Sequence, residues 1–253
     1  MPSIKSQSVV IIGGSSGIGA AAAKLACQEG VKVAIASSNP GRVDAAVKKI
    51  KAAVPDAHIS GYTVDISGYD MEEHLEKLFA QVAEANGGPL DHVILTAGLA
   101  NVKPISEYTA EHFKEAAPLR LLAPVMIAKL APRFLKPHWT SSIIFTGGSV
   151  GEKPIRGYAL GAGWAASLFG TVRALALEMA PIRVNAVSPG ATETELWGPD
   201  GEARDKIASV VAARALLGKA GRPEEVGEAY VYLMKDTNNT GSVISSSGGY
   251  LLQ

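Results

Sequence analysis

The stretch SVVIIGGSSGIG, residues 8–19, decides the fold. Its β-branched first half predicts a buried strand, and its glycine-rich second half opens an alanine-rich helix that runs through Glu29. Gly13, Gly17 and Gly19 let the backbone turn tightly and approach a pyrophosphate, which the N-terminal end of a helix attracts. A tight turn with no ligand is the alternative, because a glycine pattern alone is a weak signal. The strand–turn–helix context favours a dinucleotide site.

The same alternation of short apolar runs and helical patterns continues along the chain. Strands are predicted at residues 8–13, 31–37, 58–65, 92–98, 141–147, 182–190 and 241–249, and helices at 41–53, at 70–86 and from about Thr109. Continuous apolar strands between helices are typical of a parallel sheet covered on both faces. We therefore predict an α/β fold, one doubly wound Rossmann-type domain over residues 1–253 with a seven-stranded parallel sheet. Residues 193 to about 217 lack a strand pattern and are expected to form a lid over the substrate.

Composition excludes several classes of partner. The 24 lysines and arginines balance 24 aspartates and glutamates, so no basic field is present for nucleic acid or an anionic membrane. No apolar run approaches the ~20 residues that span a bilayer, and the N-terminus lacks a signal-peptide pattern. Cys27, the only cysteine, is expected in the core, and the five histidines show no ligand spacing, so no metal is expected. These features predict a cytoplasmic protein that acts on a small molecule.

The segment after the second strand, ASSNPGR (36–42), indicates which dinucleotide binds. An acidic residue at this point would hold the ribose 2′-hydroxyl and repel a 2′-phosphate. Here Ser37, Ser38 and Asn39 offer neutral hydrogen-bonding groups, and Arg42 offers a cation. The segment therefore favours NADP(H), although Asn-Pro-Gly is also strong turn chemistry by itself.

Two further segments are expected at the same edge of the sheet. Asp65 ends the third predicted strand, where the adenine would lie, and Thr96, Ala97 and Gly98 end the fourth with small side chains that let a cofactor pass close to the backbone. Each signal is weak alone. Both segments fall at the carboxyl ends of their strands, which is where open α/β sheets bind ligands.

Together these motifs resemble the short-chain dehydrogenase/reductase family over nearly the whole chain. The stretches that carry the resemblance are GGSSGIG (13–19), Asp65-Ile66, TAG (96–98), RVNAVSPG (183–190), GRPEEVGEAYVYLM (221–234) and TGSVISSSGG (240–249). The resemblance implies a homodimer or homotetramer. It also implies further cofactor contacts, at Ser15, Ser16, Ile18, Ile66, Pro189, Gly190, Ala191, Thr192 and Thr194.

The active site departs from the family pattern. Family members use a tyrosine that gives a proton to the substrate, a lysine one helical turn later, a carbonyl-binding serine and an asparagine on the preceding helix. Counting back from FGTVRALALE (169–178) puts Gly161 at the tyrosine position and Ala165 at the lysine position. The serine position falls on Gly148, next to Ser149, and the asparagine position falls on Arg120.

A shift of one helical turn does not restore the relay. Tyr158 would then supply the phenol, but Ala162 stands four residues later, and the only cation between Lys153 and Arg173 is Arg156. A phenol without a neighbouring cation keeps a pKa near ~10. The sequence therefore predicts that the usual relay is missing.

This combination is similar to a branch of fungal secondary-metabolite reductases with a Pro-x-x-Gly-aromatic turn, here KPIRGY (153–158). The branch includes bifunctional reductase/Diels–Alderases, which also lack the tyrosine and lysine, keep NADPH and carry an arginine at the position of Arg120. They place an acidic residue in the turn where this chain has Ile155 or its neighbour.

Three residues are candidates for catalysis. Arg120 lies between Pro118 and Pro124, which are expected to disturb the helix and tilt the guanidinium toward the cleft, where it would stabilise negative charge. A surface or interface arginine is the alternative. Tyr158 would reach the substrate from the turn or pack in the pocket wall, and Ser149 is either a polar contact or an ordinary turn serine. Trp164 and Trp197 are expected to shape an apolar pocket, although a packing role is equally open for Trp164.

Two functions fit these residues. In the first, NADPH reduces an electrophile that needs no strong acid: an iminium, an activated enone or a carbonyl polarised by Arg120. In the second, the fold is a shaped cavity that cyclises or isomerises its substrate, with NADP structural or absent. A non-catalytic NADP sensor is a third reading. The glycine turn and the 2′-phosphate signals favour the reductase, because a pure cyclase has no physical need for them.

Overall fold

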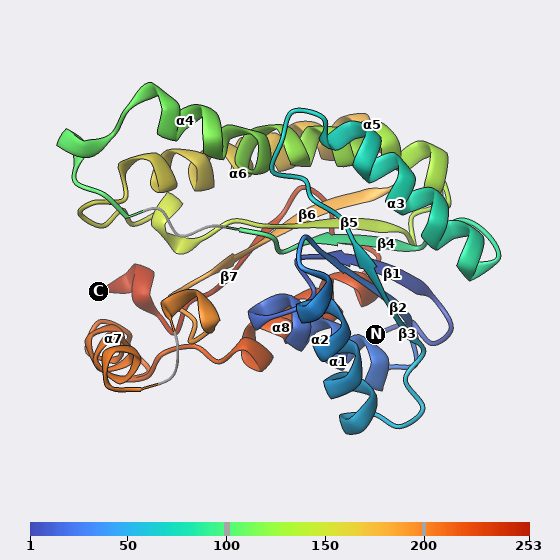
Figure 1. Cartoon of the computed structure of the whole chain (residues 1–253), viewed down its shortest axis with the longest axis horizontal. Helices are drawn as coiled ribbons and strands as arrows, with labels where there is room; N and C mark the ends of the chain where they lie inside the picture. The colour runs from blue at the N-terminus through green and yellow to red at the C-terminus, as the bar shows by residue number, and fades with distance from the viewer. Residues whose placement is uncertain (99–101, 199–200) are drawn as a thin grey trace.

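Seven short strands pair in parallel to form one twisted sheet in the computed structural model, which describes residues 1–98, 102–198 and 201–253 (Figure 1). The strand order is β3-β2-β1-β4-β5-β6-β7. The strands are β1 (Ser8–Ile12), β2 (Lys32–Ser37), β3 (Ile59–Thr63), β4 (His92–Leu95), β5 (Ser142–Thr146), β6 (Arg183–Pro189) and β7 (Val243–Ser246). The predicted seven-stranded, doubly wound α/β fold is confirmed.

Helices cover both faces of this sheet. They are α1 (Gly17–Gln28), α2 (Pro40–Ala53), α3 (Met71–Asn86), α4 (Ala110–Ala117), α5 (Ala123–Phe134), α6 (Ala159–Glu178), α7 (Glu202–Ala212) and α8 (Pro223–Lys235). Figure 1 shows α1, α2 and α8 on one face, and α3, α5 and α6 on the other. Each face buries its own apolar cluster against the sheet, one around Ile11 and Tyr230 and the other around Phe79 and Phe145.

Several strands end before the residues that the sequence predicted. Pairing stops at Thr63 in β3 and at Leu95 in β4, so Asp65 and residues 96–98 lie in the loops that follow. The amides of Thr96 and Ala97 both donate to the carbonyl of Ile12, at 2.8 and 3.1 Å, which draws the chain across the end of β1. β3 and β4 are therefore shorter than predicted, and the residues after them form loops at the carboxyl edge of the sheet.

Helix α6 is long and apolar enough, by length and composition, to cross a membrane, with a mean hydropathy of 1.3. The prediction that no apolar run approaches the length of a membrane span is therefore wrong for Ala159–Glu178. In this fold α6 packs one face against the sheet through Leu168 and Val172.

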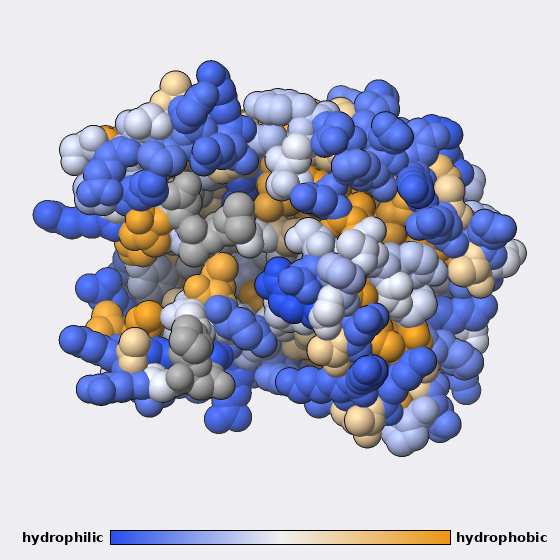
Figure 2. Space-filling view, in the orientation of Figure 1, coloured by the Kyte–Doolittle hydropathy of each residue, from blue (hydrophilic) through white to orange (hydrophobic). Residues whose placement is uncertain are grey.

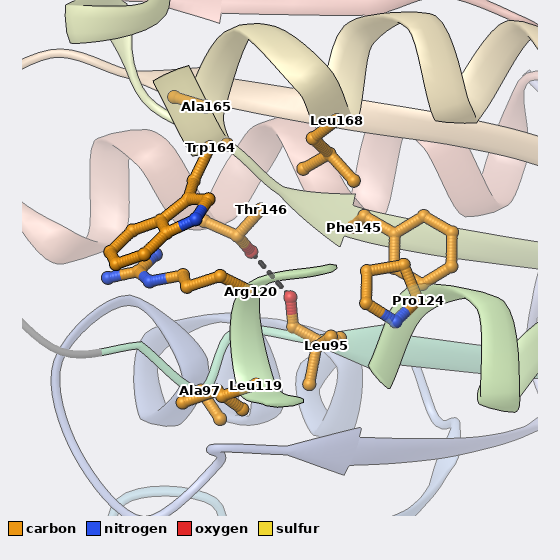
Figure 3. A pocket seen from close by; sticks show the side chains of 11 residues that line it. Leu95, Ala97, Leu119, Arg120, Pro124, Phe145, Thr146, Trp164, Ala165 and Leu168 are labelled. Carbon is orange, nitrogen blue, oxygen red and sulfur yellow. Dashed lines mark hydrogen bonds between the residues drawn. The ribbon is translucent and has the colours of Figure 1, made fainter. Parts of the chain in front are cut away.

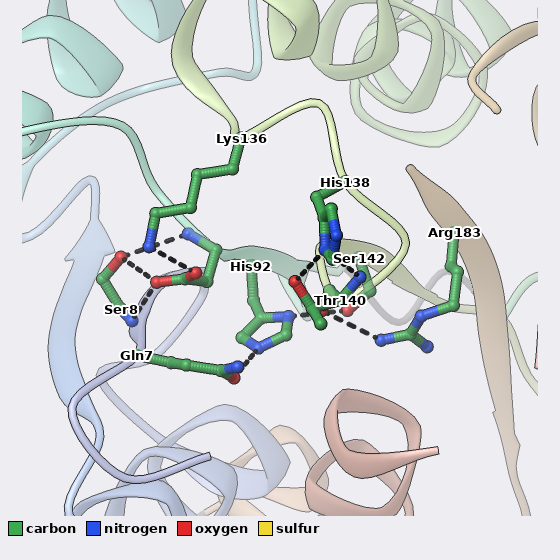
Figure 4. A network of polar contacts seen from close by, with 9 residues as sticks. Gln7, Ser8, His92, Lys136, His138, Thr140, Ser142 and Arg183 are labelled. Carbon is green, nitrogen blue, oxygen red and sulfur yellow. Dashed lines mark hydrogen bonds and ion pairs between the residues drawn. The ribbon is translucent and has the colours of Figure 1, made fainter. Parts of the chain in front are cut away.

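A buried polar network closes the opposite, amino-terminal edge of the sheet (Figure 4). Asp91 binds Lys136 at 2.7 Å and accepts from the Ser8 amide at 2.9 Å. Arg183, only 3% exposed, donates to six backbone carbonyls, of Trp139, Thr140, Leu233, Met234, Asp236 and Asn239. The guanidinium thereby satisfies the carbonyl end of α8 and the loop beyond it.

Cys27 lies in the core, as the sequence predicted. Its side chain is 5% exposed, and burial raises the pKa of its thiol to about 11. The thiol is therefore protonated at neutral pH and acts as a small apolar group.

Candidate active site

The crossover connections diverge between β1 and β4. The chain leaves β1 for α1 on one face of the sheet, whereas it leaves β4 for α4 and α5 on the other (Figure 1). A crevice therefore forms between the carboxyl ends of these two neighbouring strands, which is where open α/β sheets bind nucleotides.

The glycine turn packs tightly against the end of β4. A Cβ atom at Gly13 would lie 2.3 Å from the amide nitrogen of Ala97, and one at Gly19 would lie 2.3 Å from the carbonyl oxygen of Gly13. Both positions therefore require glycine for packing of the turn, in addition to any approach of a ligand. Gly17, at φ +50°, begins α1.

The N-terminus of α1 already holds an anion in this structure. The Gly17 amide donates to Oε2 of Glu195 at 3.0 Å, and the first turn of α1 carries no acidic residue of its own. Ser16 occupies the N-cap and follows Ser15, and Gly17 and Ile18 are the first two residues of the helix. One amide of this turn thus donates to a carboxylate at the position where the sequence predicts a pyrophosphate.

The predicted 2′-phosphate segment forms the end of β2 and the start of α2. Ser37 is the last residue of β2, and Ser38 and Arg42 are exposed. Asn39 caps α2, because its Oδ1 accepts from the Arg42 amide at 2.9 Å. The segment can therefore form a turn and still bind a 2′-phosphate. The helix cap uses only the backbone amide of Arg42, and the guanidinium of Arg42 remains at the surface.

The loop after β3 presents Asp65 at the same edge. Its carboxylate accepts from the Ser67 amide at 2.9 Å, and hydrogen bonding from the Ser67 side chain and then from this amide holds the pKa of Asp65 below its usual range. Ile66 is 5% exposed and packs in the core, so only its backbone faces the edge.

The segment after β6 completes the crevice. Gly190 follows Pro189 and packs against Ser247, whose Cα lies 2.7 Å from the position of a Cβ on Gly190. Beyond Ala191, the side chains of Thr192 and Thr194 are buried, at 6% and 9% exposure. Thr194 begins the short helix η4 (Glu195–Trp197) by accepting from the Leu196 amide.

Arg120 lies in a π-helical turn, η2 (Pro118–Leu122), between α4 and α5. Pro124 has no amide hydrogen to donate to the carbonyl of Arg120, so the α-helical pattern cannot continue there. The Ala123 amide donates to the carbonyl of Pro118 instead, five residues back. The two prolines thus disturb the helix as the sequence predicted.

The wider turn directs the Arg120 side chain into a cavity of about 30 Å³, room for a buried water molecule. The cavity is lined by Leu95, Ala97, Leu119, Arg120, Pro124, Phe145, Thr146, Gly147, Trp164, Ala165 and Leu168. The guanidinium approaches Gly98, since a Cβ there would lie 3.4 Å from both Nη atoms. Figure 3 shows the indole of Trp164 beside this guanidinium. Arg120 is therefore at the carboxyl end of β4, and Ala165 leaves space on the opposite wall.

Tyr158 lies immediately before α6 and belongs to the same site. A Cβ on Gly161 would lie 2.5 Å from Cδ1 of Tyr158, so the phenol ring fills the space where a side chain at position 161 would begin. Burial raises the pKa of Tyr158, and the charge of Arg120 lowers it in part. Burial lowers the pKa of Arg120, and Tyr158 opposes that shift. The phenol is neutral and the guanidinium charged near pH 7.

The two other candidates, Ser149 and Trp197, lie in short 3-10 helices. Ser149 is 5% exposed, starts the short helix η3 (Ser149–Gly151) and does not line the cavity. Trp197 lies in η4, within the predicted lid, of which residues 199 and 200 are outside the described part of the chain. Sequence reasoning missed Glu195, because only the path of the loop after β6 brings its carboxylate to α1.

Comparison with known proteins agrees with this geometry. A family described as "SDR-like rossmann domain" matches residues 3–253. The short-chain dehydrogenase/reductase ATR9 of Stachybotrys chlorohalonatus is 59% identical over 253 residues, 100% of each chain. The short-chain dehydrogenase/reductase malC of Malbranchea aurantiaca is 33% identical over 256 residues, 99% of this chain and 96% of its own.

Solved structures resemble it as well. The MalC reductase/Diels-Alderase from Malbranchea aurantiaca superposes with a TM-score of 0.92 at 33% identity, over 98% of this chain and 97% of its own. A small-chain dehydrogenase in complex with NADPH superposes with a TM-score of 0.79 at 29% identity, over 98% and 100%. The predicted resemblance to fungal secondary-metabolite reductases is confirmed. The chain belongs to the short-chain dehydrogenase/reductase family.

Proposed function

We propose that the protein is an NADPH-dependent reductase of a small-molecule iminium, enone or carbonyl compound in secondary metabolism. The observation that carries this proposal is the partly buried guanidinium of Arg120, which lies near Gly98 at the carboxyl end of β4. The positions of the family's tyrosine and lysine hold Gly161 and Ala165. A fixed cation therefore replaces the phenol–ammonium pair of the family.

The residues at the crevice fit a nicotinamide dinucleotide. The N-terminus of α1 would hold the pyrophosphate, Arg42 and the serines after β2 would hold the 2′-phosphate, and Asp65 would lie at the adenine. The turn after β6, from Pro189 to Thr194, would hold the nicotinamide end. The NADPH complex of a small-chain dehydrogenase that is 29% identical supports a nicotinamide dinucleotide as the cofactor.

Bound NADPH supplies the hydride. Arg120 stabilises negative charge that develops on a substrate oxygen or on a neighbouring amide, and it keeps its own proton throughout because a guanidinium is a poor acid. Tyr158 donates a hydrogen bond from its protonated phenol. An iminium takes up only the hydride, whereas a carbonyl or an enone also takes up one proton, which water would supply, directly or through this phenol. With no lysine on α6 to lower the pKa of that phenol, substrates that already carry positive charge or a strongly polarised double bond react best.

The test is turnover with NADPH of a cyclic iminium or an activated enone, compared with an unactivated ketone such as cyclohexanone. We expect loss of the reduced-nicotinamide absorbance with the activated substrate and slow or no loss with the ketone. Ketone turnover at ordinary dehydrogenase rates that Tyr158→Phe abolishes would contradict the proposal, because a complete proton relay would then be present.

Cofactor choice gives a second prediction. Arg42→Ala removes the exposed cation at the predicted 2′-phosphate position, so the affinity for NADPH should fall about tenfold while that for NADH changes little. Isothermal calorimetry with both cofactors measures the two dissociation constants, and Lys48→Ala, an exposed cation farther along α2, is the control. Equal wild-type affinities for NADPH and NADH would contradict the assignment of a 2′-phosphate site to this segment.

Cyclase or isomerase activity, with NADP structural or absent, is the second candidate. Large apolar side chains are exposed on two segments near the crevice: Val102, Ile105 and Phe113 before and in α4, and Leu196, Ile207, Val210, Leu216 and Leu217 around α7. Figure 2 shows apolar surface between the α4 and α7 ends of the molecule. These apolar side chains would hold an apolar substrate in a folded conformation. MalC is described as both a reductase and a Diels-Alderase.

The proposal also covers the lid, the location, the oligomeric state and the partners of the protein. Residues 193–217 act as the substrate lid over a single domain. The protein is cytoplasmic and forms a homodimer or homotetramer, in which a second copy covers exposed apolar side chains of α6 such as Leu177, 84% exposed. Its partner is a small-molecule substrate, with no nucleic acid, membrane or metal.

A further inference from the structure

The loop after β6 and the glycine turn after β1 meet at Gly17. The side chain of Thr194 packs over this glycine, since a Cβ there would lie 3.1 Å from Cγ2 and 3.2 Å from Cβ of Thr194. The next residue, Glu195, extends its carboxylate to the Gly17 amide, with Oε2 at 3.0 Å from the nitrogen. Two consecutive residues of the 193–198 segment are thus seated on the first residue of α1.

The carboxylate occupies a position that favours negative charge. Gly17 is the first residue of α1, so its amide has no partner within the helix and lies at the positive end of the helix dipole. A dinucleotide bound as proposed above would direct its pyrophosphate to this same amide. The carboxylate and the pyrophosphate cannot accept from it together, and their charges repel one another.

The two residues differ in how easily they can leave. Thr194 is 9% exposed and starts η4, and the Glu193 amide donates to the carbonyl of Gly221 at 2.9 Å, which anchors the base of the segment. Glu195 is exposed, so its carboxylate can rotate into water without being buried elsewhere. Glu193 and Thr194 are thus held in place, whereas the carboxylate of Glu195 can be displaced.

We propose that Glu195 is a latch, an internal anion that holds the 193–198 segment over the dinucleotide site and leaves when the cofactor pyrophosphate binds. The latch rests on the proposed dinucleotide site. It couples the start of the lid to cofactor occupancy, so the segment is free to rearrange over the substrate only after the cofactor is bound. It also weakens cofactor binding, because displacement of the carboxylate opposes it.

The test compares Glu195→Ala with the wild type and with Glu202→Ala, which removes an exposed carboxylate at the start of α7. We expect the NADPH dissociation constant of Glu195→Ala to fall about two- to fivefold, the range for one exposed charge at a helix end, with no change in Glu202→Ala. Glu195→Gln keeps an acceptor but loses the charge, so it should fall between the wild type and Glu195→Ala. An NADPH affinity of Glu195→Ala equal to or weaker than that of the wild type overturns the latch.

Amide exchange in the cofactor-free protein gives an independent readout. The Gly17 amide and the amides of residues 195–197 should exchange faster with deuterium in Glu195→Ala than in the wild type, and at wild-type rates in Glu202→Ala. Unchanged exchange in Glu195→Ala overturns the latch. If the wild type binds neither NADPH nor NADH, the dinucleotide proposal fails, and this exchange experiment still decides whether Glu195 holds the segment.

Discussion

Replacing Arg120 by alanine is expected to lower turnover of the true substrate by about 10²–10³-fold, the usual effect of removing one group directed at transition-state charge. The guanidinium lies in the cavity at the carboxyl end of β4, where burial removes water that would otherwise screen it. Neither Gly161 nor Ala165 supplies a polar side chain that could take over its role.

Kinetics on three variants separate catalysis from binding. Arg120→Ala should leave the NADPH dissociation constant and the far-ultraviolet circular dichroism nearly unchanged. Arg120→Lys should recover only part of the rate, because a point charge does not reproduce the planar guanidinium. Arg156→Ala, an exposed arginine two residues before Tyr158, is the matched control and should keep its activity. Full activity in Arg120→Ala would make Arg120 structural, and catalysis would then rest on hydride positioning and cavity shape.

Replacing Arg183 by methionine is expected to lower the free energy of unfolding by about 3–5 kcal/mol, because carbonyls that it satisfies would be left buried without a donor. Its shortest contacts are 2.7 Å to the carbonyl of Leu233, 2.8 Å to Trp139 and 2.9 Å to Asp236. These three acceptors belong to the end of α8, to the loop before β5 and to the loop before β7. One side chain therefore ties three connections to the amino-terminal edge of β6.

Urea unfolding of Arg183→Met at a fixed protein concentration measures this effect. The same substitution at Arg214, which is exposed, should change stability by no more than about 0.5 kcal/mol. A similar loss in both variants would mean that the effect comes from removing any arginine, and the network of Figure 4 would not be a main support of the fold.

The sequence was sufficient to predict the sheet, because strand and helix patterns depend on local periodicity. The Gly13–Gly19 turn, the number of strands and the helical disturbance around Arg120 follow from glycine, proline and β-branched residues whose backbone preferences are strong. The carboxyl ends of β3 and β4 were predicted too long, because pairing depends on neighbouring strands that a local pattern does not contain.

The site was predictable only in part, for the same reason. The π-helical turn carries Arg120 and the residue before α6 is Tyr158, and the charge of Arg120 partly lowers the pKa of Tyr158. Ser149, a neighbour of the family's serine position in sequence, lies outside the cavity lining. No sequence motif indicates the contact between Glu195 and Gly17, because the two residues are 178 positions apart and meet only through the path of a loop.

We predict that this chain transfers hydride from NADPH although it lacks the tyrosine–lysine pair. The most direct measurement uses NADPH deuterated at nicotinamide C4, in the pro-R or the pro-S position, with the true substrate and mass spectrometry of the product. We predict one deuterium in the product from one of the two labelled cofactors and none from the other, with no product when NADPH is omitted. Product that forms at the same rate without NADPH and carries no deuterium from either label would contradict the reductase, and would identify the protein as a cyclase or isomerase on this fold.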